Sequence, residues 1–180
     1  MNNEEGSLRD RLRRETAAAH ARVDALFGSC DFATREGYGA FLSAQATAWE
    51  TLRPMLDSGS TARADALRED LETLDLAVPA PLDVALPASA TIGHRYVLEG
   101  SRLGSTVLMR ELITKAPALA EDAGAYLRES QKIDGWKLVS TGLQNDRDGC
   151  DNDSAIIDDA LFVFGLFEKA WRATDGAERK

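Results

Sequence analysis

The residues of this chain best suited to hold a metal are its two histidines, His20 and His94. Neutral imidazole is the commonest side-chain metal ligand in proteins. His20 follows Thr16 by four residues and precedes Val23 by three, so it lies at the edge of the apolar stripe of a predicted helix. Such a histidine either forms hydrogen bonds at the border of the core or binds a metal, and position alone favours the first. We interpret His94, near the start of another predicted helix, as non-ligating.

Three glycines lie within a helical apolar pattern between residues 93 and 108. Gly93, Gly100 and Gly104 are spaced by seven and four residues and therefore share one helical face. A glycine inside a helix costs up to about 1 kcal/mol relative to alanine, so the bare face must serve a purpose that offsets this cost. The spacing predicts either close packing of another helix or contact with a flat ligand, and both interpretations are open at this point.

The predicted first helix carries much positive charge for an acidic chain. The formal net charge is −9, yet this helix contains five arginines: Arg9, Arg11, Arg13, Arg14 and Arg22. They form either a solvated helix face or a site for an anion. Arg13 precedes His20 by seven residues, which places both on the same face. The overall acidity argues against a nucleic-acid surface, which requires clustered lysine and arginine.

The elements that must position these residues are predicted to be helices throughout. Apolar residues recur at three- and four-residue steps, strand alternation of any length is absent from the sequence, and no repeats occur, so the predicted class is all-α. Ser7 is suited to cap the first helix, while Pro54 and Pro117 are expected to disturb or close others. The predicted helices span residues 8–28, 35–56, 62–76, 89 or 91–115, 118–132 with a restart at 136, and 155–173.

The segments between these helices are predicted to be turns and connectors. They comprise a turn at 58–61, a connector with Pro79, Pro81 and Pro87, and an oxygen-rich loop at 145–153. That loop fails the EF-hand spacing, so we predict a solvated loop and not a calcium site. The two cysteines lack CxxC partners and signal neither a disulfide framework nor a zinc site.

Length and composition predict one domain, residues 1–180, in which 1–7 and 175–180 are disordered tails. The 180 residues, 44% of them hydrophobic, suffice to bury one sizeable core. The first residues lack the basic start and apolar core of a signal peptide, and no apolar run is long enough to span a membrane. We therefore expect a cytoplasmic protein.

Two segments of the chain together resemble a known family. Residues 12–20, followed by Val23 and Leu26, are similar to the first helix of heme oxygenases, in which a threonine stands four residues before the axial histidine. Here these residues are Thr16 and His20. Residues 96–104 are similar to the distal helix of the bacterial branch, whose hallmark is a Glu-Gly-Ser-x-Leu-Gly run. Order, spacing, helical pattern and length extend the resemblance over most of the chain.

The resemblance implies a heme oxygenase-like helical bundle in which heme is held between the first helix and the glycine-containing distal helix. His20 would be the axial metal ligand of the heme iron. The implied catalytic residues of the distal side are Gly100, Ser101 and Gly104. The implied partners of the heme propionates are Arg13 and Tyr96, with Lys132 and Lys137 as weaker candidates.

Two positions depart from the family pattern. Ser101 occupies a position where some relatives carry an acidic residue that anchors distal waters, and a hydroxyl carries no charge. Ser105 follows Gly104 where family members have glycine or alanine. The resemblance therefore predicts extra bulk beside the distal pocket.

The implied activity is oxidative cleavage of heme, which would be both substrate and cofactor, to biliverdin, carbon monoxide and ferrous iron. No Gly-x-Gly-x-x-Gly fingerprint follows a strand, so electrons for the reaction with dioxygen are expected from a separate donor such as a ferredoxin or a reductase. A monomer is the default expectation. Two alternatives are open: a non-catalytic heme or tetrapyrrole binder on the same fold, acting as sensor or carrier, and a helical interaction module whose glycines pack against another helix.

Overall fold

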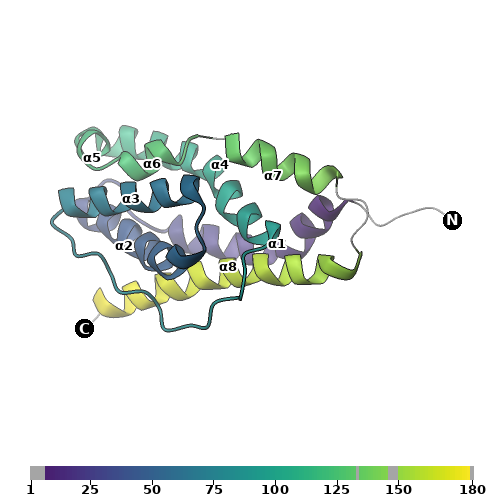
Figure 1. The fold of residues 1–180 in the computed structure, drawn as a ribbon. Helices are drawn as coiled ribbons and strands as arrows, with labels where there is room; N and C mark the ends of the chain where they lie inside the picture. The colour runs from purple at the N-terminus through teal and green to yellow at the C-terminus, as the bar shows by residue number, and fades with distance from the viewer. Residues whose placement is uncertain (1–6, 133, 146–149, 179–180) are drawn as a thin grey trace.

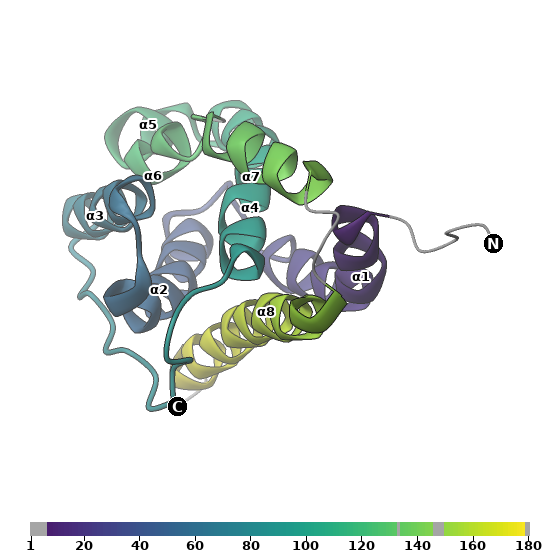
Figure 2. The ribbon, with the colours of Figure 1, turned by 45° about the vertical axis from the view of Figure 1, so that its right-hand side comes forward.

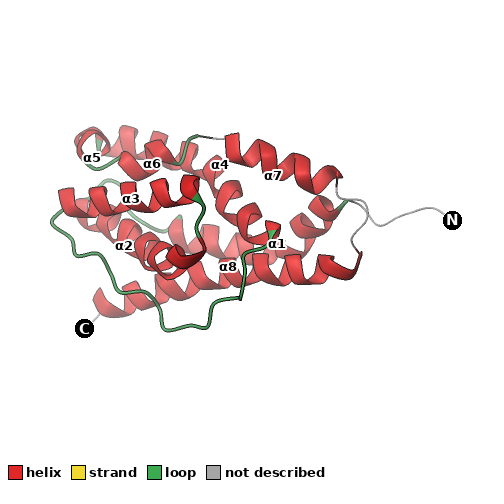
Figure 3. Ribbon diagram, in the orientation of Figure 1, coloured by secondary structure: helices red, strands yellow, loops and turns green. Residues whose placement is uncertain are grey.

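The computed structural model describes residues 7–132, 134–145 and 150–178 of the chain. The elements in order are α1 (Leu8–Phe27), α2 (Arg35–Leu52), the 3₁₀ turn η1 (Arg53–Met55), α3 (Ser58–Thr73), α4 (Ile92–Lys115), α5 (Pro117–Asp122), α6 (Ala125–Glu129), α7 (Asp134–Asn145) and α8 (Cys150–Glu178). No strand occurs among these residues (Figure 3), which confirms the predicted all-α class.

The long helix α8 is the support on which the other helices are assembled. α1, α2 and α4 each pack along α8, α3 packs on α2 and α6, and α5 packs on α4. α7 contacts both α1 and α4, on the side of these helices away from α8 (Figures 1 and 2). We call α1, α4, α7 and α8 the frame, and α2, α3, α5 and α6 the closed end.

The closed end is held by aromatic rings whose polar tips are paired. The rings of Phe32 and Phe41 lie 5.0 Å apart at their centroids. The Tyr38 hydroxyl donates to the Ala123 carbonyl at 2.9 Å, and the Trp49 indole N–H donates to the Tyr126 hydroxyl at 3.2 Å. Because buried aromatic side chains supply apolar area and their polar atoms find partners, this end forms a conventional core.

A buried carboxylate joins two helices of the closed end. Asp70 of α3 accepts hydrogen bonds from the backbone N–H groups of Ala125 and Tyr126, both at 2.8 Å, where α6 begins. Burial raises the pKa of Asp70 to about 6. The predicted single helix over residues 118–132 is wrong, because the chain breaks between α5 and α6 at Ala123 and Gly124.

Three predicted boundaries also change. Pro54 lies in η1, so α2 ends at Leu52 as its proline predicts. The predicted turn at 58–61 is instead the first turn of α3, because the Asp57 carboxylate accepts the Ser60 N–H at 2.8 Å and caps the helix. α8 begins at Cys150, earlier than predicted, and residues 175–178, assigned to a tail, continue it. Residues 1–6, 146–149 and 179–180 of the predicted tails and loop lie outside the described residues, whereas Ser7 caps α1.

Two absences hold for the described part of the chain. None of its helices is long and apolar enough to cross a membrane. Within the same ranges, no three or more histidine, cysteine, aspartate and glutamate side chains are grouped so that they could hold a metal ion.

Candidate functional site

The imidazole of His20 lies on the surface of α1. Leu12, Thr16 and Ala19 are buried along this helix, which packs on α8. The His20 side chain is 60% exposed, and its ring centroid lies 5.5 Å from that of Phe164 in α8. Its Nε2 lies 3.5 Å from a carboxylate oxygen of Asp24, one turn later. The ring therefore contacts Phe164 on one side and faces solvent on the other, so both sequence interpretations, a residue at the border of the core and a metal ligand, stay open.

The three glycines of α4 serve different purposes. A Cβ at Gly93 would collide with the Ile156 carbonyl oxygen of α8, so this glycine permits close helix packing. A Cβ at Gly100 would lie 3.4 Å from the Trp136 ring of α7. A Cβ at Gly104 would meet no heavy atom within 4 Å. Close packing therefore explains the first glycine, and only the last leaves open space beside the helix.

The face of α4 around Gly104 is both bare and apolar. Leu103 and Val107 flank it and are 52% and 62% exposed. α7 and α8 each contact both α1 and α4. The helix that carries His20 and the helix that carries the glycines are thus held in one frame (Figure 2). Exposed apolar residues grouped on one face are typical of a surface that binds an apolar ligand.

An aromatic and basic corner closes one end of the frame. The ring of Trp136 lies 5.9 Å from that of Tyr96, and the Arg9 guanidinium carbon lies 5.9 Å from the centre of the Trp136 ring. Tyr96 is partly buried. The sequence analysis singled out Tyr96 but missed the roles of Trp136 and Arg9, since no spacing rule connects positions this far apart in the chain.

The arginines of α1 divide into two groups. Arg11 pairs with Asp153 and Arg22 with Glu168, both in α8, so these two fix α1 on α8. Arg13 is exposed on the same face as His20, and no carboxylate of the described residues lies within ion-pair distance of it. Solvation therefore explains only part of the basic helix, and Arg13 is left able to meet an anion.

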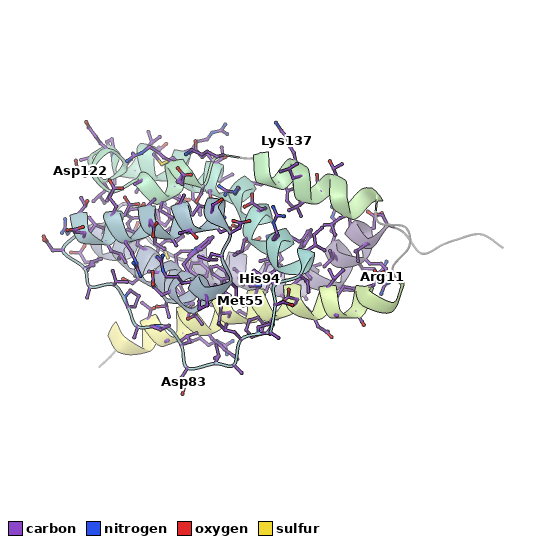
Figure 4. All side chains as sticks on the ribbon, in the orientation of Figure 1. Arg11, Met55, Asp83, His94, Asp122 and Lys137 are labelled. Atoms are coloured by element: carbon purple, nitrogen blue, oxygen red, sulfur yellow. The ribbon has the colours of Figure 1, made fainter. Side chains whose placement is uncertain are left out.

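Two candidate lysines lie at and near the start of α7. The Lys132 ammonium is exposed and pairs with Glu129. Lys137 projects from α7 on the side turned away from α8 (Figure 4). The propionate role of these lysines stays a prediction that their placement does not strengthen.

The hydroxyls of Ser101 and Ser105 are both held by hydrogen bonds within the protein, and the buried Ser105 lies away from the bare glycine face. The Ser101 hydroxyl donates to the Leu98 carbonyl at 2.8 Å and accepts from Arg63 at 3.0 Å. Ser105 is buried, and its hydroxyl donates to the Ser101 carbonyl at 3.2 Å. Successive helical residues point about 100° apart, so a residue next to Gly104 need not share its face. The predicted extra bulk of Ser105 beside the distal pocket is wrong.

Behind the glycine face lies a buried guanidinium that the sequence analysis missed. Arg63 of α3 is fully buried and donates to the Leu98 carbonyl at 2.6 Å and to the hydroxyls of Ser130 and Ser101, each at 3.0 Å. Its guanidinium carbon also lies 4.6 Å from the centre of the Trp49 ring. Burial lowers the pKa of Arg63, which nevertheless stays charged as arginines do in proteins. Arg63 therefore places a positive charge directly behind the turn of α4 that precedes Gly100.

A buried ion pair within α4 lies against the first turn of α7. Glu99 accepts a hydrogen bond from Arg102 at 2.7 Å, and Arg102 also donates to the Glu129 carbonyl at 3.1 Å. A Cβ at Gly135 would collide with the Glu99 carboxylate, so the first turn of α7 lies directly against it. The glutamate of the Glu-Gly-Ser-x-Leu-Gly run thus positions the helix that carries Trp136.

Comparison with known proteins finds heme oxygenases both among related sequences and among solved structures. No family model matches the chain. It is 39% identical to the heme oxygenase of Xanthomonas campestris over 86 residues, which cover 46% of this chain and half of that protein's length. It is 31% identical to the heme oxygenase PigA of Pseudomonas aeruginosa over 145 residues, 71% of this chain and 72% of that one. Its fold matches that of Neisseria meningitidis heme oxygenase in NO- and CO-bound crystals, with a TM-score of 0.74 at 25% identity over 94% of this chain and 92% of that one.

Proposed function

The chain belongs to the heme oxygenase family, and from this premise we propose that it cleaves heme with dioxygen to biliverdin, carbon monoxide and ferrous iron. The match to the Pseudomonas enzyme carries the premise, because it exceeds two thirds of both chains. The match to the Xanthomonas enzyme spans half of that protein and adds local similarity.

One structural observation supports the proposal most strongly, namely the uncovered backbone of α4 at Gly104. A Cβ there would meet no described heavy atom of another element within 4 Å, and the exposed residues Leu103 and Val107 border the space. Heme is a flat, largely apolar plate with anionic propionates at one edge. A bare helix face with apolar borders fits such a plate. Glycine has no Cβ, so the plate can approach the backbone of α4 more closely there than at any other residue type.

His20 is the residue that we propose for the iron. Heme when bound supplies the redox-active iron and is itself the substrate. The neutral imidazole of His20 would bind that iron, and Phe164 beneath the ring would limit its rotation. Asp24, at 3.5 Å from Nε2, would attract any proton on the ring and so influence which nitrogen is available.

Two residues of the frame are suited to the propionates. Arg13 is exposed on the His20 face without an acidic partner among the described residues, and a guanidinium pairs bidentately with a carboxylate. Tyr96 presents a hydroxyl from the aromatic corner beside Trp136. We propose Arg13 and Tyr96 for this role and do not extend it to Lys132 or Lys137.

The glycine face would decide which edge of the macrocycle is attacked. Gly104 leaves open space beside α4, and the backbone of α4 would restrict the direction from which dioxygen could approach a bound heme. We propose that electrons come from a separate donor protein, since the sequence encodes no dinucleotide fingerprint, and that the protein acts as a monomer.

The test is a single-turnover experiment with hemin and purified protein. A Soret band on mixing would report heme binding. A reductant under air, with catalase present to remove free peroxide, should then bleach that band while a broad red biliverdin absorbance grows and ferrous iron is released. A Soret band that persists through the reaction would contradict the proposed activity, and no Soret band at all would contradict heme binding.

A further inference from the structure

A buried carboxylate of α8 holds the first turn of α4. One oxygen of Asp159 accepts both the backbone N–H of Thr91, at 2.9 Å, and the Thr91 hydroxyl, at 2.7 Å. The Thr91 hydroxyl in turn accepts the Gly93 N–H at 3.0 Å and caps α4. The N-cap of α4 is therefore fixed from another helix, and the collision that any Cβ at Gly93 would make with Ile156 shows how closely the two backbones approach.

The second oxygen of Asp159 and the neighbouring imidazole are left without partners. His94 is 1% exposed, and neither of its ring nitrogens has a hydrogen-bond partner among the described residues; the same holds for Asp159 Oδ1. His94 Nδ1 lies 3.8 Å from Asp159 Oδ1, too far for a hydrogen bond and close enough for an ion pair once the ring is protonated. Buried polar atoms without partners are rare, so this pair calls for an explanation.

His94 lines a cavity that opens to the surface. A cavity of about 270 Å³ is lined by His94, Met55 and Leu98 together with Asp57 and Arg95, whose side chains are half exposed and bring it to the surface. Figure 4 shows His94 and Met55 beside one another in the middle of the molecule.

The charged groups facing the imidazole act in opposite directions. They are Asp159 from α8, Asp57 at the cap of α3 and Arg95 on the same helix as His94, itself paired with Asp57 at 3.5 Å. Burial lowers the pKa of His94 below its ordinary value although both carboxylates act to raise it. The ring is therefore neutral near pH 7 and takes up a proton only on acidification.

α8 connects this pair to the heme site. Asp159 lies just over one helical turn before Phe164, whose ring contacts His20. From Thr91, α4 runs directly to Gly100 and Gly104. The contact between Asp159 and Thr91 therefore sets where the glycine face lies relative to the helix that supports the axial histidine.

We propose that Asp159 is a positioning residue of the heme site: it holds the first turn of α4 on α8 and so sets the separation between the glycine face and His20, with His94 as its proton-sensitive neighbour. The link to heme rests on the proposed function. The contact between α4 and α8 does not depend on the proposed function.

The first experiment uses the heme-free protein. Asp159→Asn keeps an amide oxygen for both Thr91 donors and removes the charge, whereas Asp159→Leu removes both. Hydrogen exchange at the Thr91 and Gly93 amides should be about tenfold faster in Asp159→Leu, the effect of about one lost hydrogen bond, and nearly unchanged in Asp159→Asn. NMR titration should give a lower His94 pKa in Asp159→Asn than in the natural chain, because an attracting carboxylate is gone. Unchanged exchange in Asp159→Leu, or an unchanged His94 pKa in Asp159→Asn, overturns the proposal.

The second experiment measures the ratio of biliverdin isomers. It should change in Asp159→Leu and in the near-isosteric Thr91→Val, and it should be retained in Asp159→Asn at a pH where His94 is neutral in both proteins. In the natural chain, the isomer ratio should change as the pH falls and His94 is protonated. In Asp159→Asn, the same change should occur only at a lower pH, because the His94 pKa is lower in that variant. Asp70→Leu is the matched control, because Asp70 also accepts two backbone N–H groups at the start of a helix but belongs to the closed end. A normal ratio in both Asp159→Leu and Thr91→Val, or an equal change in Asp70→Leu, overturns the positioning role.

The two proposals fail separately. If the natural chain does not open heme, the exchange and titration experiments still decide whether Asp159 holds α4. If the natural chain opens heme but the isomer ratio is unchanged in Thr91→Val and Asp159→Leu, only the positioning role is contradicted.

Discussion

The frame and the closed end of this molecule bury their side chains in opposite ways. In the closed end, rings such as Tyr38 and Trp49 are fully buried and their polar tips are paired. In the frame, Leu103, Val107 and the imidazole of His20 are exposed although they lie on long, well-packed helices. Exposed apolar residues grouped on one face are typical of a surface that binds a ligand, as we propose for heme.

We therefore expect the closed end to determine the stability of the fold and the exposed face of the frame to determine heme cleavage. Substitutions in the closed end should change the free energy of unfolding more than the rate of heme cleavage. Substitutions on the exposed face of the frame should change the rate of heme cleavage more than the free energy of unfolding. α8 serves both regions, since it packs on α2 of the closed end and on α1 and α4 of the frame.

The largest effect is expected at His20. His20→Ala should abolish heme cleavage because it removes the proposed iron ligand, while the free energy of unfolding stays within about 0.5 kcal/mol, as for other exposed positions. Single-turnover absorbance and urea unfolding measure the two quantities. Biliverdin formation at the natural rate would show that another residue binds the iron.

Gly93→Ala tests the joint between α4 and α8. The added methyl group would collide with the Ile156 carbonyl, and overpacking of this kind costs up to about 3 kcal/mol, more than alanine gains in helix propensity. Urea unfolding should show the loss. A variant as stable as the natural chain would mean that the two helices separate easily.

Asp70 should make the closed end sensitive to pH. Its pKa rises from 3.8 to about 6 on folding, so the protonated form is favoured in the folded state. Protonated Asp70 therefore contributes fully to the free energy of unfolding below about pH 4, and this contribution is lost as the pH rises through 6. The loss should be about 2 kcal/mol after allowance for solvent screening. Unfolding of the natural chain and of Asp70→Asn between pH 4 and 7 measures the difference. Parallel pH profiles for the two proteins would contradict the assignment.

The same substitution at Gly104 should act in the opposite sense from Gly93. A Cβ at this position meets no atom, so alanine should raise the free energy of unfolding by about 0.5–1 kcal/mol through helix propensity. Heme affinity should fall, because the methyl group enters the space proposed for the plate. Hemin titration measures the change in heme affinity, and urea unfolding measures the change in the free energy of unfolding. Unchanged heme affinity would place the ligand elsewhere.

The smallest effect is expected at Arg13. Arg13→Ala should weaken hemin binding a few-fold, because an exposed ion pair contributes at most about 1 kcal/mol. Arg14→Ala is the matched control, since Arg14 is also exposed but lies beside Glu15 at 3.5 Å. Equal hemin affinities for the two variants would remove Arg13 from the proposed propionate role.

Local chemistry made much of this predictable from the sequence. Ser7 and Thr91 cap helices because a short hydroxyl side chain reaches the backbone a few residues on, and Pro54 interrupts α2 because it has no N–H to donate. The all-α class and the position of His20 beside the stripe formed by Leu12, Thr16 and Ala19 follow from the same local periodicity. These features depend on residues within one helix.

Tertiary structure decided what each candidate residue faces. Spacing puts Gly93, Gly100 and Gly104 on one face, but the first meets the backbone of α8, the second meets Trp136 and the third meets open space. The roles of Arg63 and of the pair His94 and Asp159 were hidden for the same reason, although Arg63 does share the inward stripe of Leu67 and Leu71. The physical reason is that helical periodicity fixes the direction of a side chain relative to its own axis, whereas its partner belongs to an element far away in the chain.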